Sequence, residues 1–187
     1  MSEQTELPTE SMTVEAFCAW VDAAPRPRCE LEEGRVVAMA PERAIHGEAK
    51  AAAWLALRNA IRAAGVDGRA YRDSLAVAVG PSTAYQPDVL VNCGPRPAPA
   101  ALVAPNPVIV VEVSSPSTSR VDAVAKFLDY MRLDSIRHYL LIDAVKRIVV
   151  HHRKEADGRI MTMILPTGPL TLDPPGITVQ VESLFED

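Results

Sequence analysis

The sequence predicts an α/β (α+β) protein in which a mixed β-sheet is flanked by helices, and three observations support this class. Hydrophobic residues make up 48% and charged residues 23% of the chain, which are typical globular values. Amphipathic helical stretches alternate with short apolar runs that have the length of strands. A helix is expected between the apolar run at 107–115 and the strand at 137–143, and this order favours a sheet with helices on its faces.

The N-terminal half contains two predicted helices separated by a predicted hairpin. Thr13 is a suitable N-cap for a helix that Pro25 would end. Residues 29–40 are expected to form a hairpin, because a glycine supplies the permissive backbone of its turn. Residues 44–64 are rich in alanine and are followed by Gly65, which predicts a long helix closed by a glycine.

The second half is dominated by predicted strands. A proline-rich stretch at 93–107 is expected to form a surface loop, because proline cannot donate to a ladder. Residues 119–133 have the pattern of an amphipathic helix. Its predicted core stripe consists of Val121, Val124, Leu128 and Met131. The strands are expected at 71–80, 85–92, 107–115, 137–143, 147–154, 158–166 and 176–187.

Charge, cysteine content and the start of the chain limit the function classes. The net charge of −5 is opposite to that of proteins that coat nucleic acid through bulk charge, so any such binding must be local or bridged by metal. The three cysteines are widely spaced, which predicts free thiols. The acidic, polar N-terminus and the absence of a long apolar run predict a cytoplasmic protein with no membrane partner. We expect residues 1–11 to be disordered and residues 12–187 to form one domain.

Two carboxylates within apolar strands are the first candidate site residues. Asp88 lies in QPDVLV and Glu112 lies in VIVVEVSS. Because an unpaired buried charge is costly, each carboxylate needs a partner, which can be a buried Arg or Lys or a divalent cation. Two carboxylates from neighbouring strands make a good site for a hard cation, and Mg²⁺ favours one or two carboxylates together with water and phosphate.

The predicted helix at 119–133 adds a third candidate group. Asp122, Lys126 and Tyr130 are spaced four residues apart and therefore share one face. Lys126 could extend from this face toward the end of the strand that carries Glu112. The alternative is an ordinary exposed Asp–Lys pair, which contributes little to stability.

These residues resemble those of a known family. From CELEEGRVVAM, through PD in a strand, to VEVSSPSTSRVDAVAKFLDYMRLDSIRHYLLID, the chain resembles the Uma-two-like restriction endonucleases of the PD-(D/E)XK nuclease superfamily. The resemblance implies a restriction-endonuclease-like mixed sheet with an N-terminal helix and β-hairpin. The matching positions are Glu30, Gly34, His46, Pro87, Asp88, Glu112, Ser114, Pro116, Asp122, Lys126, Tyr130, Tyr139 and Asp143.

The resemblance also implies a metal-dependent endonuclease that hydrolyses phosphodiester bonds in nucleic acid, with DNA as the expected substrate. Asp88 and Glu112 would be catalytic acids that bind Mg²⁺, with Mn²⁺ as a substitute. Ser114 stands where the superfamily usually has a lysine, so Lys126 looks like a migrated catalytic lysine. The residues expected to line the site are Glu30, His46, Ser114 and Asp122.

Two alternatives stay open. A catalytically silent protein of the same fold could bind nucleic acid or a protein partner, which the acidic net charge and the missing lysine favour. A structural domain could use Asp88 and Glu112 in salt bridges. Because duplex DNA has two strands and each chain has one site, a homodimer is expected, with apolar residues of the late strands at its interface. Those residues are Ile148, Val150, Ile160 and Met163.

Overall fold

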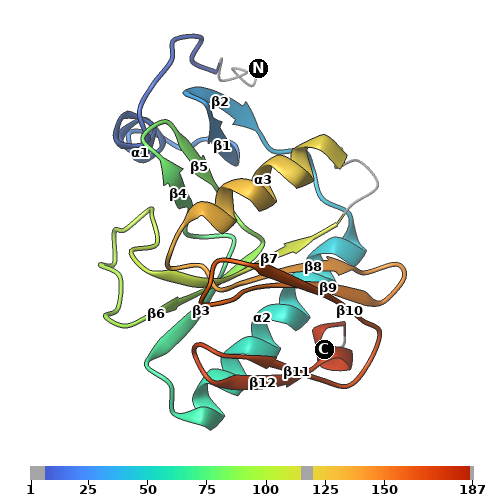
Figure 1. Ribbon diagram of the computed structural model, residues 1–187. Helices are drawn as coiled ribbons and strands as arrows, with labels where there is room; N and C mark the ends of the chain where they lie inside the picture. Colours follow the sequence, from blue (N-terminus) through green and yellow to red (C-terminus); the bar gives the residue numbers. More distant parts are fainter. Residues whose placement is uncertain (1–6, 115–119, 186–187) are drawn as a thin grey trace.

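The structure is a computed structural model that describes residues 7–114 and 120–185 (Figure 1). A six-stranded sheet forms its centre, in the order β10-β9-β8-β7-β6-β3. β7 and β8 are parallel and all other neighbours are antiparallel, so the predicted mixed sheet is confirmed. The strands are β3 (Gly68–Arg72), β6 (Val89–Cys93), β7 (Pro107–Val113), β8 (His138–Asp143), β9 (Ile148–Lys154) and β10 (Ile160–Leu165).

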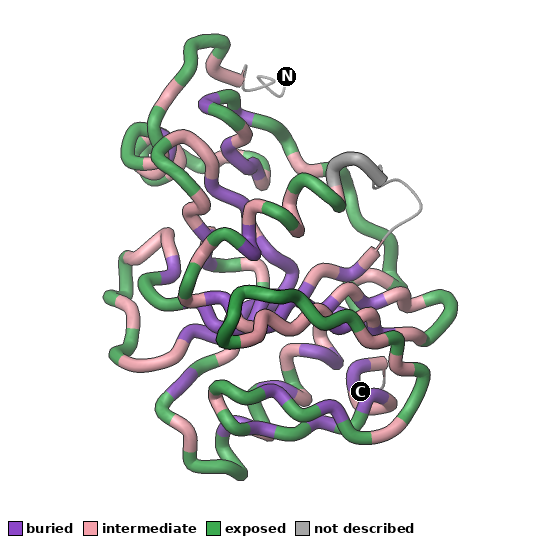
Figure 2. The backbone as a smooth tube through the Cα atoms, in the orientation of Figure 1, coloured by how far each residue is buried: buried purple, intermediate pink, exposed green. Residues whose placement is uncertain are grey.

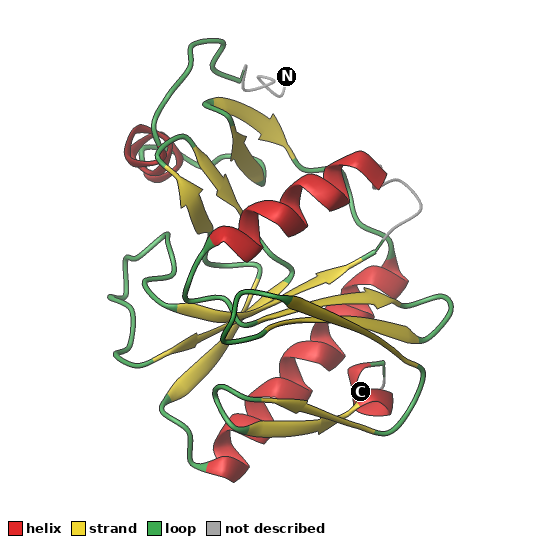
Figure 3. Ribbon diagram, viewed as in Figure 1, coloured by secondary structure: helices red, strands yellow, loops and turns green. Residues whose placement is uncertain are grey.

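Helices cover both faces of this sheet, as predicted (Figure 3). α2 (Ala44–Ala64) packs on one face, together with the hairpin of β11 (Pro169–Leu172) and β12 (Ile177–Gln180) and the short 3-10 helix η1 (Val181–Leu184). α3 (Arg120–Arg132) packs on the opposite face and lies between the parallel strands β7 and β8 in the chain. Buried residues concentrate along the central strands, between the two layers (Figure 2).

A smaller four-stranded sheet, in the order β2-β1-β5-β4, lies beside α3 and carries α1 (Figure 1). The predicted hairpin at 29–40 supplies two of its strands, and Glu33 and Gly34 occupy the turn with positive φ angles of 47° and 84°. A third core cluster joins this sheet to α1. The elements are α1 (Val14–Asp22), β1 (Cys29–Glu32), β2 (Arg35–Ala38), β4 (Val77–Gly80) and β5 (Thr83–Tyr85).

The helix start at Thr13 and the helix end at Gly65, both predicted from the sequence, are confirmed. The Thr13 hydroxyl accepts a hydrogen bond from the Ala16 N–H at 3.2 Å and caps α1. Gly65 ends α2 in the left-handed conformation with φ 64°. None of the described helices is long and apolar enough to cross a membrane. Residues 1–6 of the predicted disordered segment lie outside the described residues.

The buried face of α3 differs from the predicted core stripe. Val124 and Leu128 are 56% and 48% exposed, so their assignment to the core was wrong. Met131 is buried as expected, and the side chain of Val121 lies outside the described residues.

Aromatic packing explains how α3 is rotated on the sheet. Tyr130 is fully buried, and its ring lies 5.6 Å from that of Tyr85 in β5 and 5.8 Å from that of Tyr139 in β8, measured between centroids. Such ring pairs add to the area that the tyrosines bury. Because Lys126 is one helical turn before Tyr130, the same rotation directs Lys126 inward.

Candidate active site

The two candidate acids lie at neighbouring strands of the central sheet. Glu112 belongs to β7, and Asp88 directly precedes β6. The antiparallel register pairs Val89 with Val111, so the next position outward brings Asp88 beside Glu112. The backbone N–H of Val113 donates to Asp88 Oδ2 at 2.7 Å, which fixes this carboxylate at the end of β7.

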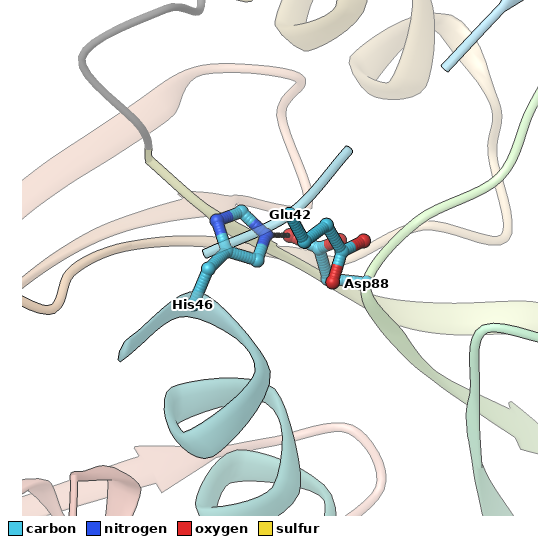
Figure 4. Close-up of side chains that lie close together, drawn as sticks. All are labelled: Glu42, His46 and Asp88. Atoms are coloured by element: carbon cyan, nitrogen blue, oxygen red, sulfur yellow. Dashed lines mark hydrogen bonds and ion pairs between the residues drawn. The ribbon is translucent and has the colours of Figure 1, made fainter. Parts of the chain in front are cut away.

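Asp88 is buried and is held by side chains from α2. Lys50 Nζ lies 2.9 Å from Asp88 Oδ1, and His46 Nε2 lies 3.1 Å from Asp88 Oδ2. Figure 4 shows the His46 ring directed from the first turn of α2 toward Asp88. Burial raises the pKa of Asp88, but the hydrogen bond from His46 and the charge of Lys50 lower it below its ordinary value. Asp88 is therefore ionised at neutral pH.

Lys50 is the central cation of this half of the site. Its side chain is 1% exposed, and Nζ lies 2.5 Å from a Glu42 oxygen, 2.6 Å from an Asp73 oxygen and 2.9 Å from Asp88. Arg28 also bonds Glu42 and Asp73, at 2.6 and 2.7 Å. Burial lowers the pKa of Lys50, but the surrounding carboxylates raise it above its ordinary value. A salt bridge to a buried lysine, one of the two partners considered for Asp88 from sequence, is thus present.

Sequence reasoning missed Glu42, Lys50 and Asp73. A signal for Lys50 was available, because it follows His46 by four residues in a predicted helix and shares its face. Glu42 and Asp73 lie in connections between elements, where only the fold shows what they contact. Glu42, His46 and Asp88 place potential ligand atoms within 4.8 Å of one another, and this described group does not include Glu112 (Figure 4).

Glu112 has an environment unlike that of Asp88. The Tyr130 hydroxyl donates to Glu112 Oε1 at 3.2 Å. Burial raises the pKa of Glu112, and the charges of Asp88 and Glu30 raise it further against the opposing charge of Lys126, to about 8. This carboxyl therefore holds a proton at neutral pH unless a cation joins it.

Lys126 reaches into the site from α3. Its Nζ lies 2.6 Å from Glu30 Oε2 and 5.1 Å from the centroid of the Tyr85 ring. Glu30 is buried, and its other oxygen accepts the backbone N–H of Gln86 at 2.9 Å. Burial lowers the pKa of Lys126, but the charges of Glu112 and Glu30 raise it above its ordinary value. The ammonium is therefore charged and interacts with both acids.

Ser114 is not brought into these contacts. The Ser114 hydroxyl donates to the Ile142 carbonyl at 3.2 Å, and its backbone N–H donates to the same carbonyl at 2.8 Å. Ser114 thus joins the end of β7 to β8. The side chain of Asp122 lies outside the described residues. The structure therefore brings together Asp88, Glu112, Lys126, Glu30 and His46.

Comparison with known proteins decides the family. A family model described as "Uma2: Putative restriction endonuclease" matches residues 14–182. The chain belongs to the Uma2 family. The resemblance seen in the sequence is thereby confirmed, and membership of the Uma2 family supports a nuclease-like function.

Two similar proteins extend the comparison for this Uma2 member. The crystal structure of a putative nuclease belonging to DUF820 from Anabaena variabilis has a TM-score of 0.71 at 17% identity, covering 93% of this chain and 97% of that one. At this identity the likeness establishes the fold. The uncharacterized protein slr1290 of Synechocystis sp. is 36% identical over 72 residues. That match spans only 38% of the relative's length and 38% of this chain.

The Uma2-family site carries an excess of negative charge. Its ion-pair network together with Glu112 contains five carboxylates and four basic groups, which leaves one negative charge unbalanced when every acid is ionised. A divalent cation would offset this excess, and carboxylate oxygens are the ligands that Mg²⁺ and Mn²⁺ prefer. The donor set therefore fits a hard divalent ion. The carboxylates are Glu30, Glu42, Asp73, Asp88 and Glu112, and the basic residues are Arg28, Lys50, Arg72 and Lys126.

Proposed function

We propose that this Uma2-family protein is a metal-dependent endonuclease that hydrolyses phosphodiester bonds in DNA, with Mg²⁺ as the ion and Mn²⁺ as a substitute. The observation that carries the proposal is the convergence of three side chains in one site: Asp88 beside the start of β6, Glu112 of β7 and Lys126 of α3. Family membership supports the same reaction class.

Each residue has a defined task in this proposal. Asp88 and Glu112 would hold the ion, with Glu42 and His46 close enough to Asp88 to add ligands. A bound divalent ion polarises a phosphate and lowers the pKa of bound water. Lys126 supplies a fixed positive charge beside Glu112, where it can bind a phosphate oxygen and stabilise the charge that develops on it. The Val113 N–H and the Lys50 ammonium keep Asp88 ionised and fix its orientation.

Metal titration tests the binding part of the proposal. Calorimetry with Mg²⁺ and with Mn²⁺ is expected to show binding to the wild type and none to Asp88→Ala. Asp88→Asn is a matched variant that keeps the shape and the acceptor for the Val113 N–H. Equal metal affinity in the wild type and both variants would exclude Asp88 as a ligand.

Lys126→Ala separates catalysis from folding. The variant is expected to lose most Mg²⁺-dependent cleavage of plasmid DNA, since losing one preorganised charge commonly costs ~10²–10³ in rate. Metal affinity should be largely kept. Because the substitution leaves the Glu30 carboxylate without its ammonium, Lys126→Ala combined with Glu30→Gln controls for that uncompensated charge. Cleavage at the wild-type rate by Lys126→Ala would remove this lysine from the mechanism.

One observation favours a second candidate, a catalytically silent binding protein of the same fold. The ammonium of Lys50 already bonds Asp88, so this acid has a partner without metal. Under this alternative the protein would bind DNA or a protein partner, and neither Mg²⁺ nor Mn²⁺ would bind at Asp88. The calorimetric titration therefore separates the two candidates.

We also propose a homodimer, with β10 as the contact. β10 is an edge strand of the central sheet, and its sequence IMTMIL contains neither charge nor proline, the usual protection of free edges. Ile160, Met161 and Ile164 are 39%, 47% and 67% exposed. Antiparallel pairing of two β10 strands about a two-fold axis would cover these side chains in both copies. A cytoplasmic location stays a prediction.

A further inference from the structure

A line of aromatic and basic side chains continues from the candidate site along α2. His46, Lys50, Trp54, Arg58 and Arg62 follow one another at intervals of four residues, so they form one slowly turning stripe on the helix. The first two contact Asp88. The last two are exposed and carry the stripe away from the site. In Figure 1, α2 runs beneath the central sheet, and a short connection joins its end to β3.

Trp54 organises two arginines from different elements. Its indole N–H donates to the Ala70 carbonyl of β3 at 3.1 Å, which fixes the ring. The guanidinium carbon of Arg58 lies 5.2 Å from the ring centroid, and that of Arg72 from β3 lies 5.9 Å from it. Cation–π contacts of this kind hold the guanidinium groups in place while their N–H donors stay available.

These arginines have few carboxylate partners within the described part of the protein. Among the described ion pairs, neither Arg58 nor Arg62 has a carboxylate partner, and Arg72 reaches only Asp73, with 4.0 Å between Nε and Oδ2. The protein as a whole has a net charge of −5. Exposed arginines without carboxylate partners are available to an anionic ligand, and a guanidinium fork suits the oxygens of a phosphate.

A chain of contacts links Arg72 to the candidate site. Arg72 is followed by Asp73, which bonds Lys50, which in turn bonds Asp88. Along the helix axis, Lys50 and Arg62 are separated by about 18 Å at 1.5 Å per residue. This length corresponds to about five steps of a nucleic-acid strand at 3.4 Å each.

We propose that Arg58 and Arg72, organised by Trp54, form together with Arg62 a phosphate-backbone binding surface that holds a DNA strand next to the Asp88–Glu112 site. The proposal rests on the nuclease function proposed above for its substrate class, and it assigns residues that the cleavage site does not contain. Contacts to the phosphate backbone carry no sequence information, so this surface would give affinity and orientation without choosing a target sequence.

The test measures DNA binding without cleavage. Fluorescence anisotropy of a mixed-sequence duplex of about 30 base pairs, longer than the surface at 3.4 Å per step, is recorded in EDTA at several salt concentrations. Arg58→Gln with Arg62→Gln is expected to weaken binding at least about tenfold and to reduce the slope of log K against log salt by about 1.8, since each phosphate contact contributes about 0.9. Arg72→Gln added to this pair should lower the slope again.

A matched control removes the same charge elsewhere. Arg132→Gln with Arg159→Gln takes away two exposed arginines that pair with Asp129 and Asp157, far from α2 in the sequence. This control should keep wild-type affinity and slope. Loss of binding equal to that of the Arg58 and Arg62 variant would show a bulk-charge effect and would overturn the proposal.

The outcomes also separate this inference from the proposed nuclease function. Weakened binding by the Arg58 and Arg62 variant supports the surface even if the wild type cleaves nothing. Unchanged binding by that variant overturns the surface even if the wild type cleaves DNA with Mg²⁺. A wild type that does not bind the duplex at low salt overturns it as well.

Discussion

Replacing Glu112 by glutamine is expected to stabilise the metal-free protein while removing a proposed metal ligand. The carboxyl of Glu112 has a pKa raised to about 8 by burial and by the charges of Asp88 and Glu30. Glutamine is uncharged and nearly the same shape, and its carbonyl oxygen can still accept the Tyr130 hydroxyl. The substitution therefore removes the charge and keeps the hydrogen bond.

The size of the effect follows from the difference between the pKa of Glu112 in the folded protein and in the unfolded chain. Between the ordinary pKa of 4.5 and the raised value of about 8, the folded protein keeps a proton on Glu112 that the unfolded chain has released. The free energy of unfolding therefore falls as pH rises through this window. At ~1.36 kcal/mol for each unit, the wild type loses up to about 4 kcal/mol between pH 5 and pH 8 through this group.

Urea unfolding in EDTA at several pH values measures this effect. Groups remote from Glu112 titrate alike in the wild type and in Glu112→Gln, so the difference between the two stability curves reports Glu112 together with its charged neighbours Asp88 and Lys126. The difference should be small near pH 5 and should grow in favour of the variant toward pH 8. Glu48→Gln, which changes an exposed glutamate of α2, is the matched control and should follow the wild type.

Added Mg²⁺ connects the stability effect with the proposed function. At pH 8 the ion should restore stability to the wild type, because it binds the folded state alone, and it should do so less for Glu112→Gln. Stability curves of the wild type and Glu112→Gln that stay parallel from pH 5 to pH 8 would show that Glu112 is ionised in the folded protein. The charge argument for a cation at this position would then be refuted.

Three further predictions concern other parts of the molecule. Lys50→Met should destabilise the protein by about 3–5 kcal/mol in urea unfolding, because it leaves the buried carboxylate of Asp88 without its cation. His138 and His151 bond each other at 2.9 Å in the core, where burial lowers their pKa values to about 4 and about 3. NMR should therefore detect neither imidazole gaining a proton between pH 8 and pH 5. Because the unfolded chain binds these protons at the ordinary pKa of 6.5, the free energy of unfolding should fall as pH drops below about 6.5. Ile164→Lys should convert the proposed dimer to a ~20 kDa monomer in sedimentation, and a wild type that is already monomeric at micromolar concentration would contradict the β10 contact.

The parts of the fold that sequence predicted correctly depend on local interactions. The Thr13 cap and the Gly65 helix end each involve residues within one turn, so the residue type alone indicates the structure. The face of α3 could not be predicted in this way. Its apolar residues Val124 and Leu128 form a plausible stripe, but packing of Tyr130 against distant aromatic rings decides the rotation.

The candidate site likewise contains some residues that the sequence indicates and others that only the fold brings together. Asp88 and Glu112 attract attention because carboxylates in apolar strands are costly, and this signal is present in the sequence itself. The carboxylates around Lys50 come from separate connections of the chain, and their convergence is a property of the folded protein alone. Sequence reasoning therefore identified the acids of the motif and missed the buried lysine that Asp88 contacts.

The ion pair between Glu30 and Lys126 makes the small sheet a component of the site. Glu30 comes from β1, whereas α3 packs on the central sheet, so this ion pair adds to the contact of Tyr130 with Tyr85 in joining α3 to the small sheet. Loosening the packing of α1 on the small sheet would leave Asp88 and Glu112 in place but would release Lys126 from Glu30. Lys126 would then be free to neutralise Glu112 and compete with a cation. A substitution in the α1 cluster, remote from every candidate ligand, could thus lower metal affinity without touching the site.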